Sequence, residues 1–396
     1  MFLTKLFFAA AFSFAVLFLF SCKDLPTDLG NNLLNQDKPS FIHFSSDSIK
    51  QESYSFKHVV QLHNNTRMFI GKKDNIKASS LIQFYINLPD TIANSINDGS
   101  LDILSSNVQL IRNYDFGDST ANIDFNAYQI NSPWGLEFTS DSLASLSYGS
   151  SDLIQSKDLG DSLFNFTLDN STVKTWLQAA ADTNLPEQHG FILKPTESSE
   201  KIVGFYPLTA DLSYYPNLMV VLSKPGIYVD TLNFFPAMNL SVVEGTLPAV
   251  SQGNISVQGG LTVNSKLWFD VSGIPKDAVI SNAELVLKLD KSETFLGSTS
   301  NSAILAYSLI DSTNIDSIYS SSLTLTESGD SLYLSSSNSI KTLTAYIDNW
   351  LKGDNQGLLL TTYGQTTGLD LFSIKGSNAA NIADKPKLRI TYTRLK

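Results

Sequence analysis

The side chains most used for catalysis and metal binding are scarce in this chain. Its 396 residues contain one cysteine, Cys22, and four histidines, which lie at positions 43, 58, 63 and 189. A single cysteine excludes an internal disulfide and a zinc site made of several thiolates. No histidine stands in a motif that would activate a nucleophilic serine, and residues 225–396 contain no histidine. We therefore expect that the protein is not an enzyme.

Cys22 ends an N-terminal segment with the features of a secretory signal. Lys5 precedes an apolar run over residues 6–20, which is shorter than the roughly 20 residues of a membrane-spanning helix. The sequence Leu-Phe-Ser-Cys at residues 19–22 resembles a bacterial lipobox, which implies cleavage before Cys22 and acylation of its sulfur. The alternative is an ordinary signal peptide with an incidental cysteine. We expect residues 1–21 to form the lipoprotein signal peptide and residues 22–40 a flexible tether.

The charge of the chain limits its partners. Its 27 Lys and Arg face 38 Asp and Glu, which gives a net charge of −11 and a pI near 4.8. Nucleic-acid binding requires clustered cations, so we expect no nucleic-acid partner. The lipobox instead predicts a lipid-anchored protein of the outer membrane, exposed at the cell surface, whose first partner is the membrane itself.

Four aromatic residues stand in polar loop settings that suit sugar binding. Pyranose rings stack their CH faces on exposed aromatic rings beside hydrogen-bonding side chains. Trp134 lies between a proline and a glycine, while Tyr214, Tyr215 and Tyr363 have polar surroundings. We expect these residues, Trp134 foremost, to contact a ligand. The alternative for each is a half-buried loop residue with a structural role.

One short segment offers oxygen ligands for calcium. Asp311, Asn314 and Asp316 place three such side chains within six residues, and carboxylate and amide oxygens are the ligands that calcium prefers. The segment lacks the glycine and the distal glutamate of an EF-hand loop, and a solvated turn is the alternative. Apart from a structural calcium ion here, we expect no cofactor.

A recurring triplet of Asp, then Ser or Thr, then an aliphatic residue or Thr resembles the O-glycosylation acceptors of Bacteroidetes extracytoplasmic proteins. The alternative is that Asp and Ser recur because they favour turns and strand entries. The acceptor hydroxyls would belong to Ser48, Thr91, Ser119, Ser142, Ser162, Thr231, Ser312, Ser317 and Ser331.

Beyond residue 40, short runs of Val, Ile, Leu, Phe and Tyr alternate with Ser, Asn, Asp and Gly clusters. Several runs alternate apolar and polar residues, as over 285–289 and 387–392, which is typical of strands with one buried face. Many short strands separated by turns favour antiparallel sandwiches. The sequence therefore predicts an all-β protein of two tandem antiparallel, jelly-roll-like β-sandwich domains, each with one short helix.

The two halves repeat one another. Five segments recur in the same order, so that 80–84, 103–110, 173–177, 189–193 and 215–220 correspond to 265–269, 279–285, 347–351, 356–360 and 385–390. In this alignment Leu110 corresponds to Leu285, and Leu218 to Leu388. We expect one domain over residues 41–224 and a second over residues 225–396.

Each half also contains one predicted helix. Asp169 or Asn170 can cap a helix through Trp176 to Ala181, and Ser337 or Asn338 can cap a helix over 340–351 that Gly353 ends. The apolar residues of the second segment fall on one helical face. We expect Trp176 and Trp350 to be buried under a sheet rather than to bind a ligand.

The repeated segments resemble the DNRLRE-type domains of bacterial secreted proteins, which are related to an alginate-binding carbohydrate-binding module. The second half carries the resemblance best, through Leu-Trp-Phe-Asp at 267–270, Gly-Leu-Leu-Leu at 357–360 and Pro-Lys-Leu-Arg-Ile-Thr-Tyr at 386–392. The first half resembles a diverged member of this family. The chain as a whole is also similar to Bacteroidetes lipoproteins. The resemblance implies a β-sandwich and, more distantly, a carbohydrate ligand. The family's usual entry motif is absent from both halves, so no binding residue is assigned from it.

Three functions follow as hypotheses. The first is a non-catalytic, lipid-anchored envelope protein that binds polysaccharide or mediates surface adhesion. The second is a structural or assembly component of the outer-membrane surface with a protein partner. The third is a polysaccharide-degrading enzyme that uses two carboxylates, which the acidic surface disfavours for anionic substrates because like charges repel.

Overall fold

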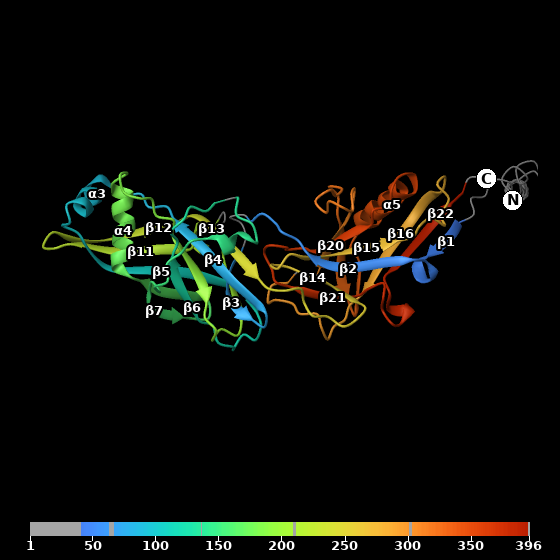
Figure 1. Ribbon diagram of the computed structural model, residues 1–396, viewed down its shortest axis with the longest axis horizontal. Helices are drawn as coiled ribbons and strands as arrows, with labels where there is room; N and C mark the ends of the chain where they lie inside the picture. Colours follow the sequence, from blue (N-terminus) through green and yellow to red (C-terminus); the bar gives the residue numbers. More distant parts are fainter. Residues whose placement is uncertain (1–40, 63–66, 136, 209–210, 301–302, 395–396) are drawn as a thin grey trace, which may run out of the picture.

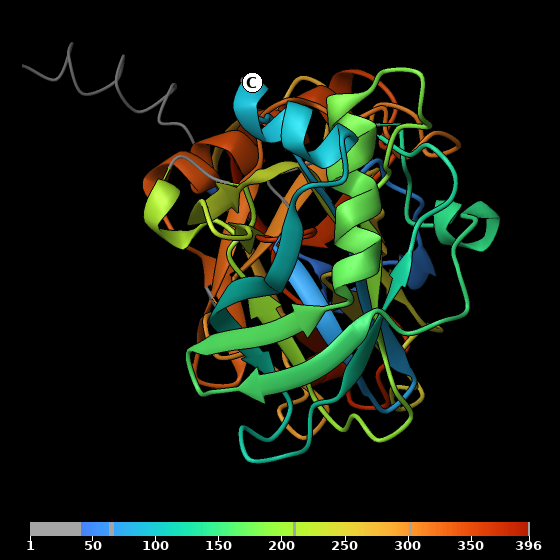
Figure 2. The same cartoon turned by 90° about the vertical axis from the view of Figure 1, so that its left-hand side faces the viewer.

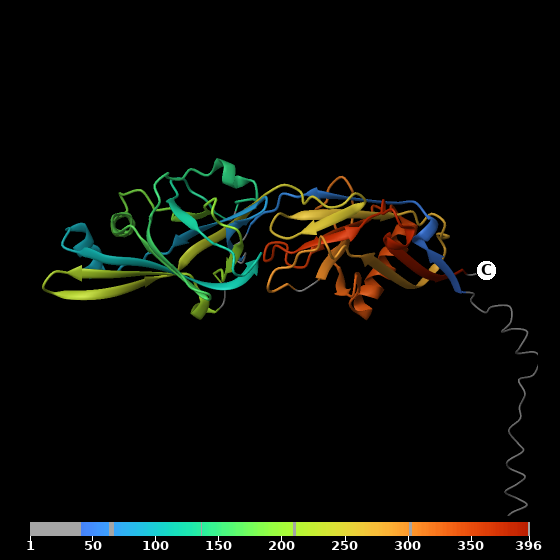
Figure 3. The ribbon, with the colours of Figure 1, turned by 90° about the horizontal axis from the view of Figure 1, so that it is seen from below.

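The computed structural model describes residues 41–394 apart from 63–66, 136, 209–210 and 301–302. It confirms the predicted all-β fold, with two large antiparallel sheets that each curl into a sandwich. The two sandwiches lie end to end in an elongated molecule (Figure 1). β1 and the C-terminal strand β22 lie together at one end, as Figures 1 and 3 both show.

The first sandwich contains eleven strands, in the order β12-β11-β5-β10-β3-β4-β9-β6, with β13 on β4 and the β7–β8 hairpin on β5. The long strand β5 pairs with β11 and β8 along its first part and with β10 along its last part, so it joins the two layers. The bounds are β3 Met68–Lys73, β4 Ile76–Phe84, β5 Asp102–Phe116, β6 Phe125–Gln129, β7 Ile154–Leu159, β8 Leu163–Leu168, β9 Phe191–Pro195, β10 Ile202–Phe205, β11 Asn217–Lys224, β12 Tyr228–Phe234 and β13 Pro236–Glu244.

The second sandwich also contains eleven strands, in the order β1-β22-β16-β19-β18-β17-β20-β15-β14-β21, with β2 on β15. A bridge between Leu289 and Ile374 connects the end of β16 to β21. The bounds are β1 Phe41–Ser45, β2 Gln51–Lys57, β14 Asn254–Gln258, β15 Val263–Phe269, β16 Val279–Lys288, β17 Ala303–Ser308, β18 Leu323–Ser328, β19 Ser331–Leu334, β20 Leu358–Thr362, β21 Leu371–Lys375 and β22 Lys387–Thr393.

Two helices form where the sequence predicts them. α4 (Asn170–Ala181) begins after Asp169, whose carboxylate accepts the Thr172 N–H at 2.9 Å. α5 (Ser337–Lys352) ends at Gly353 as expected, but its N-cap is Ser336, one residue before the predicted caps. The 3-10 turns are η1 Ser46–Ser48, η2 Ser142–Ser145, η3 Leu212–Tyr214 and η4 Ile382–Asp384.

A third helix, α3 (Asp90–Asn97), corrects the expectation of one helix in each half. It packs beside α4 at the far end of the first sandwich, as the end-on view of Figure 2 shows. The helix buries only Ile92, Ser95 and Ile96, so its apolar pattern is too short to indicate a helix.

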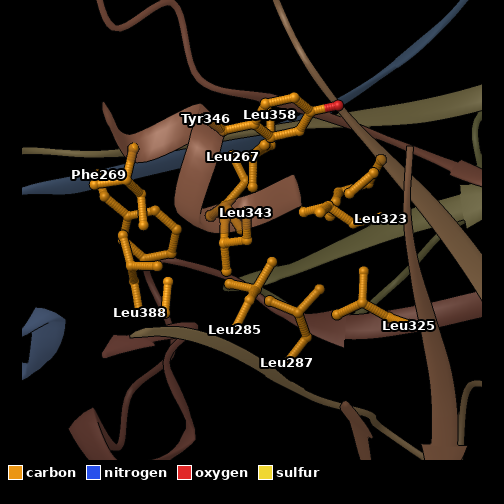
Figure 4. Close-up of a cluster of buried hydrophobic side chains, with 14 of the residues drawn as sticks. Leu267, Phe269, Leu285, Leu287, Leu323, Leu325, Leu343, Tyr346, Leu358 and Leu388 are labelled. Carbon is orange, nitrogen blue, oxygen red and sulfur yellow. The ribbon is translucent and has the colours of Figure 1, made fainter. Parts of the chain in front are cut away.

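Each sandwich has its own apolar core. Trp176 and Trp350 are buried in these cores, 2% and 5% exposed, which confirms the prediction that they are structural. In the second sandwich, Leu343 and Tyr346 of α5 pack onto Leu267, Leu285 and the other strand side chains shown in Figure 4. The alternating residues of each strand supply this core because successive side chains point to opposite faces of a sheet.

The strand pairings correct the expected domain boundary near residue 224. β12 and β13, which follow that boundary, pair with β11 and β4 of the first sandwich. β1 and β2, which open the expected first domain, pair with β22 and β15 of the second sandwich. Figure 1 shows β2 in blue among the orange and red strands. The leading strands of the two sequence repeats are therefore exchanged between the sandwiches.

The ladders confirm the repeat and refine its alignment. Ser80 pairs with Leu193 in the first sandwich, and Ser265 pairs with Leu360 in the second, as the sequence alignment requires. On the other strands, Leu218 pairs with Val108 while Leu388 pairs with Leu285. Val108, not Leu110, is thus the structural equivalent of Leu285. The predicted alignment was therefore wrong by two residues on this strand. A shift of two residues keeps every side chain on the same face of the sheet, so the pattern of apolar residues could not reveal it.

A pair of serines holds each exchanged strand. Ser55 of β2 lies opposite Ser265 of β15 with their hydroxyl oxygens 3.0 Å apart, and Ser241 of β13 lies opposite Ser80 of β4 at 3.1 Å. The Oγ of Ser55 accepts a backbone N–H from β14, and the Oγ of Ser241 accepts one from β3, both at 2.7 Å. The same contact therefore recurs in both sandwiches. The first half of the chain provides the strand for the second sandwich, and the second half provides the strand for the first.

Tyr114 joins the two sandwiches. Its hydroxyl oxygen accepts the Leu369 N–H at 2.9 Å, and its ring lies under the Arg67 guanidinium at 4.6 Å. Burial raises the pKa of the Tyr114 phenol above its ordinary value, so the group stays neutral. Gly297 is required beside it, because a Cβ there would lie 2.0 Å from the hydroxyl oxygen. Phe116 also meets Phe295 edge to face at 4.8 Å.

The strand exchange predicts which engineered cysteines can pair. In a Cys22→Ser chain with a protease site at 246–252, Ser55→Cys with Ser265→Cys should form a disulfide, because these positions are direct cross-strand neighbours. After cleavage the two fragments should stay linked on a non-reducing gel. Ser241→Cys with Ser265→Cys is the matched control, since these positions also lie on opposite sides of the cleavage site and would pair only if β13 lay on β15. Linkage in the control alone would contradict the exchange.

Replacing Tyr114 with Phe should lower the free energy of unfolding by about 1–3 kcal/mol, because the buried Leu369 N–H loses its acceptor. Urea denaturation measures this loss. Tyr333→Phe, at an exposed position, should change stability by less than about 0.5 kcal/mol. Equal effects of the two substitutions would show that the hydrogen bond contributes nothing.

Candidate functional site

The second sandwich carries a polar cleft of about 310 Å³ with two aromatic rings in its lining, which we call the Trp268 cleft. Its floor is formed by the neighbouring strands β2 and β15, and one wall by the turn before β20. The cleft brings together two rings, two cations, one carboxylate and three neutral polar side chains. It is lined by Lys50, Glu52, Tyr54, Lys266, Trp268, Ser312, Asn355 and Gln356.

Hydrogen bonds to the neighbouring turn fix the Trp268 ring. Its indole Nε1 donates to the Asn355 carbonyl oxygen at 3.0 Å. The Asn355 side chain donates to the Phe269 carbonyl at 2.8 Å and accepts the Gly357 N–H at 3.1 Å. Gly357 has a φ of +91°, and a Cβ there would lie 2.7 Å from the Leu267 carbonyl oxygen. The turn and the ring are therefore held as one unit.

The first sandwich contains the same turn without the tryptophan. Gln188 takes the place of Asn355, donates to the Phe84 carbonyl at 2.9 Å and accepts the Gly190 N–H at 2.7 Å. Gln83 takes the place of Trp268 and donates to the Gln188 carbonyl at 2.8 Å. The repeat thus preserves the turn, while the ring is specific to the second sandwich.

Charges lie on both sides of the Trp268 ring. Lys50 pairs with Glu52 at 2.7 Å, and its ammonium lies 5.7 Å from the ring centroid. Their hydrogen bond raises the pKa of Lys50 and lowers that of Glu52, so both stay charged at neutral pH. Burial lowers the pKa of Lys266, whose ammonium has no ion-pair partner among the residues described. The cleft can therefore offer Lys266 as a donor to an incoming ligand.

Tyr54 supplies a second ring at the cleft. Its side chain is 52% exposed, on the exchanged strand β2 opposite Lys266. A half-buried indole, an exposed phenol and adjacent amide and charged donors form the combination that binds sugar rings by stacking and hydrogen bonding. Glu52 and Tyr54 belong to the exchanged strand β2, and Lys50 comes directly before it.

The aromatic residues predicted from the sequence lie elsewhere. Trp134 is half-buried against a core cluster, and its Nε1 donates to the His189 carbonyl at 2.8 Å, which matches the structural alternative. Tyr363 is 55% exposed beside a separate hollow of about 300 Å³ in the second sandwich. The structure does not bring either residue to the Trp268 cleft.

Tyr214 and Tyr215 lie on the first sandwich. Tyr214 is exposed and stacks on Tyr206 at 4.5 Å, while the half-buried Tyr215 meets Phe235 edge to face at 6.0 Å. Tyr215 also lines a mainly apolar hollow with Tyr85 and Phe235. Tyr214 and Tyr215 therefore lie on the first sandwich, whereas the Trp268 cleft lies on the second.

The proposed calcium ligands already bond to other groups of the chain. The Asp311 carboxylate accepts both the N–H and the hydroxyl of Thr313 at 2.8 Å, which lowers its pKa. Asn314 accepts the Asp316 N–H at 3.2 Å, and the Asp316 carboxylate meets His58 at 3.0 Å. These are the contacts of a polar turn. Within the described parts of the chain, no three His, Cys, Asp or Glu side chains gather as a metal site.

The proposed glycosylation hydroxyls differ in exposure. Thr91, Ser119, Ser162 and Thr231 are exposed, whereas Ser142, Ser312 and Ser317 are half-buried. Ser331 is buried, 7% exposed, and donates to Asp330, so its hydroxyl is inaccessible in the folded chain. Nothing is described for the side chain of Ser48.

Cys22, the predicted signal peptide and the tether lie outside the described residues. Among the helices that are described, none is long and apolar enough to cross a membrane.

Trp268 was visible in the sequence only as part of a strand. Its neighbours Leu267 and Phe269 are buried, so period-two alternation places the Trp268 ring on the opposite, outer face. The outward direction of the ring could therefore be predicted from the sequence. The approach of Lys50, Glu52 and Tyr54 to that ring could not be predicted, because no local pattern indicates that β2 crosses to the second sandwich.

Comparisons of the chain with protein-family models, curated proteins and solved structures find no match. The resemblance to DNRLRE-type domains therefore stays a prediction.

The conserved geometry of the two turns predicts matched effects. Asn355→Ala and Gln188→Ala each remove two hydrogen bonds to backbone groups and should lower the free energy of unfolding by about 1–3 kcal/mol. Chemical denaturation of both variants tests this. The exposed Asn131→Ala is the control, with an expected change below about 0.5 kcal/mol. Losses no larger than that of the control would show that the turns are held by other contacts.

Proposed function

We propose that this protein is a non-catalytic, lipid-anchored component of the cell envelope that binds polysaccharide at the Trp268 cleft. The observation that carries the proposal is the fixed indole beside an exposed phenol, with donors and acceptors from Lys266, Asn355 and Gln356 at the same cleft. Such a surface matches the alternating apolar and hydroxyl faces of a sugar ring.

The openness of the site to solvent suits a polymer. The cleft lies on the outer face of β2 and β15, so it is open to a sugar within a longer chain. The charges of Lys50 and Glu52 largely offset one another, which leaves Lys266 as the unpaired cation. Sugars with an acidic group near the stacked ring therefore gain one charge-assisted hydrogen bond.

The proposed anchor is compatible with this position. The predicted tether ends at residue 40, and β1 begins at Phe41 in the same sandwich as the cleft. Eighteen or so extended residues span at most about 65 Å, so the second sandwich would stay close to the membrane surface.

A protein partner is the second candidate function, supported by the opposite end of the molecule. The β11–β12 hairpin reaches the far end of the first sandwich in Figures 1 and 3, and it exposes Ile227 and Val229 by 70% and 65%. Apolar side chains exposed together favour protein contacts. Recovery of one stoichiometric partner from detergent-solubilised membranes, lost in Ile227→Ser with Val229→Ser, would support this function.

Trp268→Ala should weaken binding of the mature chain by at least about tenfold, because stacking on a central ring dominates such sites. Electrophoresis through gels that contain alginate, pectin, xylan or a β-glucan measures binding as retardation. Tyr54→Ala, at an exposed position, should weaken binding without loss of folding.

Tyr319→Ala, exposed and outside the cleft, is the matched control and should bind as the unaltered chain does. Absence of retardation in every gel, or equal retardation of Trp268→Ala and the control, would overturn the proposed function.

A further inference from the structure

A second cleft of the second sandwich is lined by four cations, although the chain as a whole is acidic. It has a volume of about 250 Å³ and lies on the outer face of the sheet over β16, β19 and β22. We call it the basic cleft. Its charged and aromatic lining consists of Lys288, Asp330, Tyr333, Lys385, Lys387 and Arg389.

The strand register explains why these cations gather. Lys387 and Arg389 alternate with buried Leu388 and Ile390 along β22, so both side chains share the outer face. Val286 of β16 lies between Lys387 on one side and Tyr333 on the other. Lys288, two residues further along β16, lines the same cleft together with Lys385. Cations gathered in one cleft repel one another, so this arrangement costs stability.

Only part of this charge is neutralised. Lys288 contacts Asp384 at 2.8 Å and Asp330 at 3.6 Å, and Arg389 approaches Glu284 at 3.7 Å. Lys385 and Lys387 have no ion pair among the residues that the structure describes. Their ammonium groups are therefore available to a ligand, and two ammonium groups beside a guanidinium suit a phosphate group.

The position of the cleft favours a membrane lipid as the source of that phosphate. β22 pairs with β1, and Arg389 lies opposite Ser45, the last residue of β1. The predicted tether enters the fold at Phe41, on the same pair of strands. The net negative charge of the chain would otherwise repel it from an anionic bilayer, whereas lysines held near such a surface attract it.

We infer that the basic cleft binds the phosphate of a membrane lipid headgroup and thereby holds the second sandwich against the bilayer. The inference depends on the proposed envelope location but not on polysaccharide binding at the Trp268 cleft. The exposed Tyr333 ring, 45% exposed at the rim, would then lie at the depth of the headgroups, where amphipathic rings are favoured.

Vesicle co-sedimentation tests the inference with residues 22–396 carrying Cys22→Ser, so that no acyl chain contributes. Vesicles of phosphatidylcholine with 30% phosphatidylglycerol should bind the chain, and pure phosphatidylcholine vesicles should not. Lys385→Ala with Lys387→Ala should weaken binding by roughly 10- to 30-fold, because two cations are lost.

Lys276→Ala with Lys341→Ala is the matched control, since both lysines are exposed on the same sandwich outside the cleft. This control should retain binding, as should Trp268→Ala. Equal losses of vesicle binding in the two double variants would show that the effect comes from overall charge. That result would overturn the proposed site. Absence of vesicle binding would also overturn it. Cleft-dependent binding of inorganic phosphate without vesicle binding would identify a soluble phosphate ligand and overturn the lipid assignment.

Failure here is separable from failure of the proposed function. If the chain is retarded by polysaccharide but does not bind vesicles, the proposed function is supported and the lipid-binding inference is overturned. If the chain binds vesicles but is not retarded by polysaccharide, polysaccharide binding is overturned and lipid binding at the basic cleft is supported.

Discussion

The crosswise placement of β2 and β13 is the constraint on which the rest of the structure depends. Each strand forms a full antiparallel ladder in the sandwich of the other repeat. The serine pairs at 3.0 and 3.1 Å fix both registers and supply an acceptor for a backbone N–H of a third strand. Neither sandwich is complete without a strand from the other repeat, so neither half of the sequence carries a whole sandwich by itself.

The exchange also builds the Trp268 cleft. β15 supplies Trp268 and Lys266, whereas the exchanged strand β2 supplies Glu52 and Tyr54, and Lys50 comes directly before that strand. A ligand across the cleft would contact both strands and would favour the exchanged arrangement, because a ligand stabilises the state that binds it. The turn of Asn355 and Gly357 provides the fixed wall, and its counterpart at Gln188 and Gly190 shows that this turn forms in both sandwiches, whereas the tryptophan ring is present in one.

The contact at Tyr114 sets how the sandwiches meet. The buried phenol, neutral because of its raised pKa, accepts a backbone N–H from the other sandwich under the Arg67 guanidinium. Backbone and hydroxyl bonds between Asp115 and Ser298, at 2.8 and 2.9 Å, extend the same contact. Two connecting segments and this buried contact therefore join the sandwiches. The Trp268 cleft and the basic cleft both lie on the sandwich where β1 begins, while the exposed hairpin of β11 and β12 lies at the opposite end.

The sequence by itself determined the all-β class, the repeat, the helices at Asp169 and before Gly353, and the burial of Trp176 and Trp350. These features depend on local periodicity and capping, which a single segment carries in its own residues. It left α3 unrecognised because that helix buries only one short turn of apolar residues. Tertiary structure alone decided that Val108 matches Leu285, since a shift of two preserves the buried face. It alone placed β2 on β15, because β2 and β13 carry serines at matching positions and no local pattern distinguishes their partners. The candidate site followed from that choice: Lys50 and Tyr54 meet Trp268 only because strands far apart in the chain are paired by the fold.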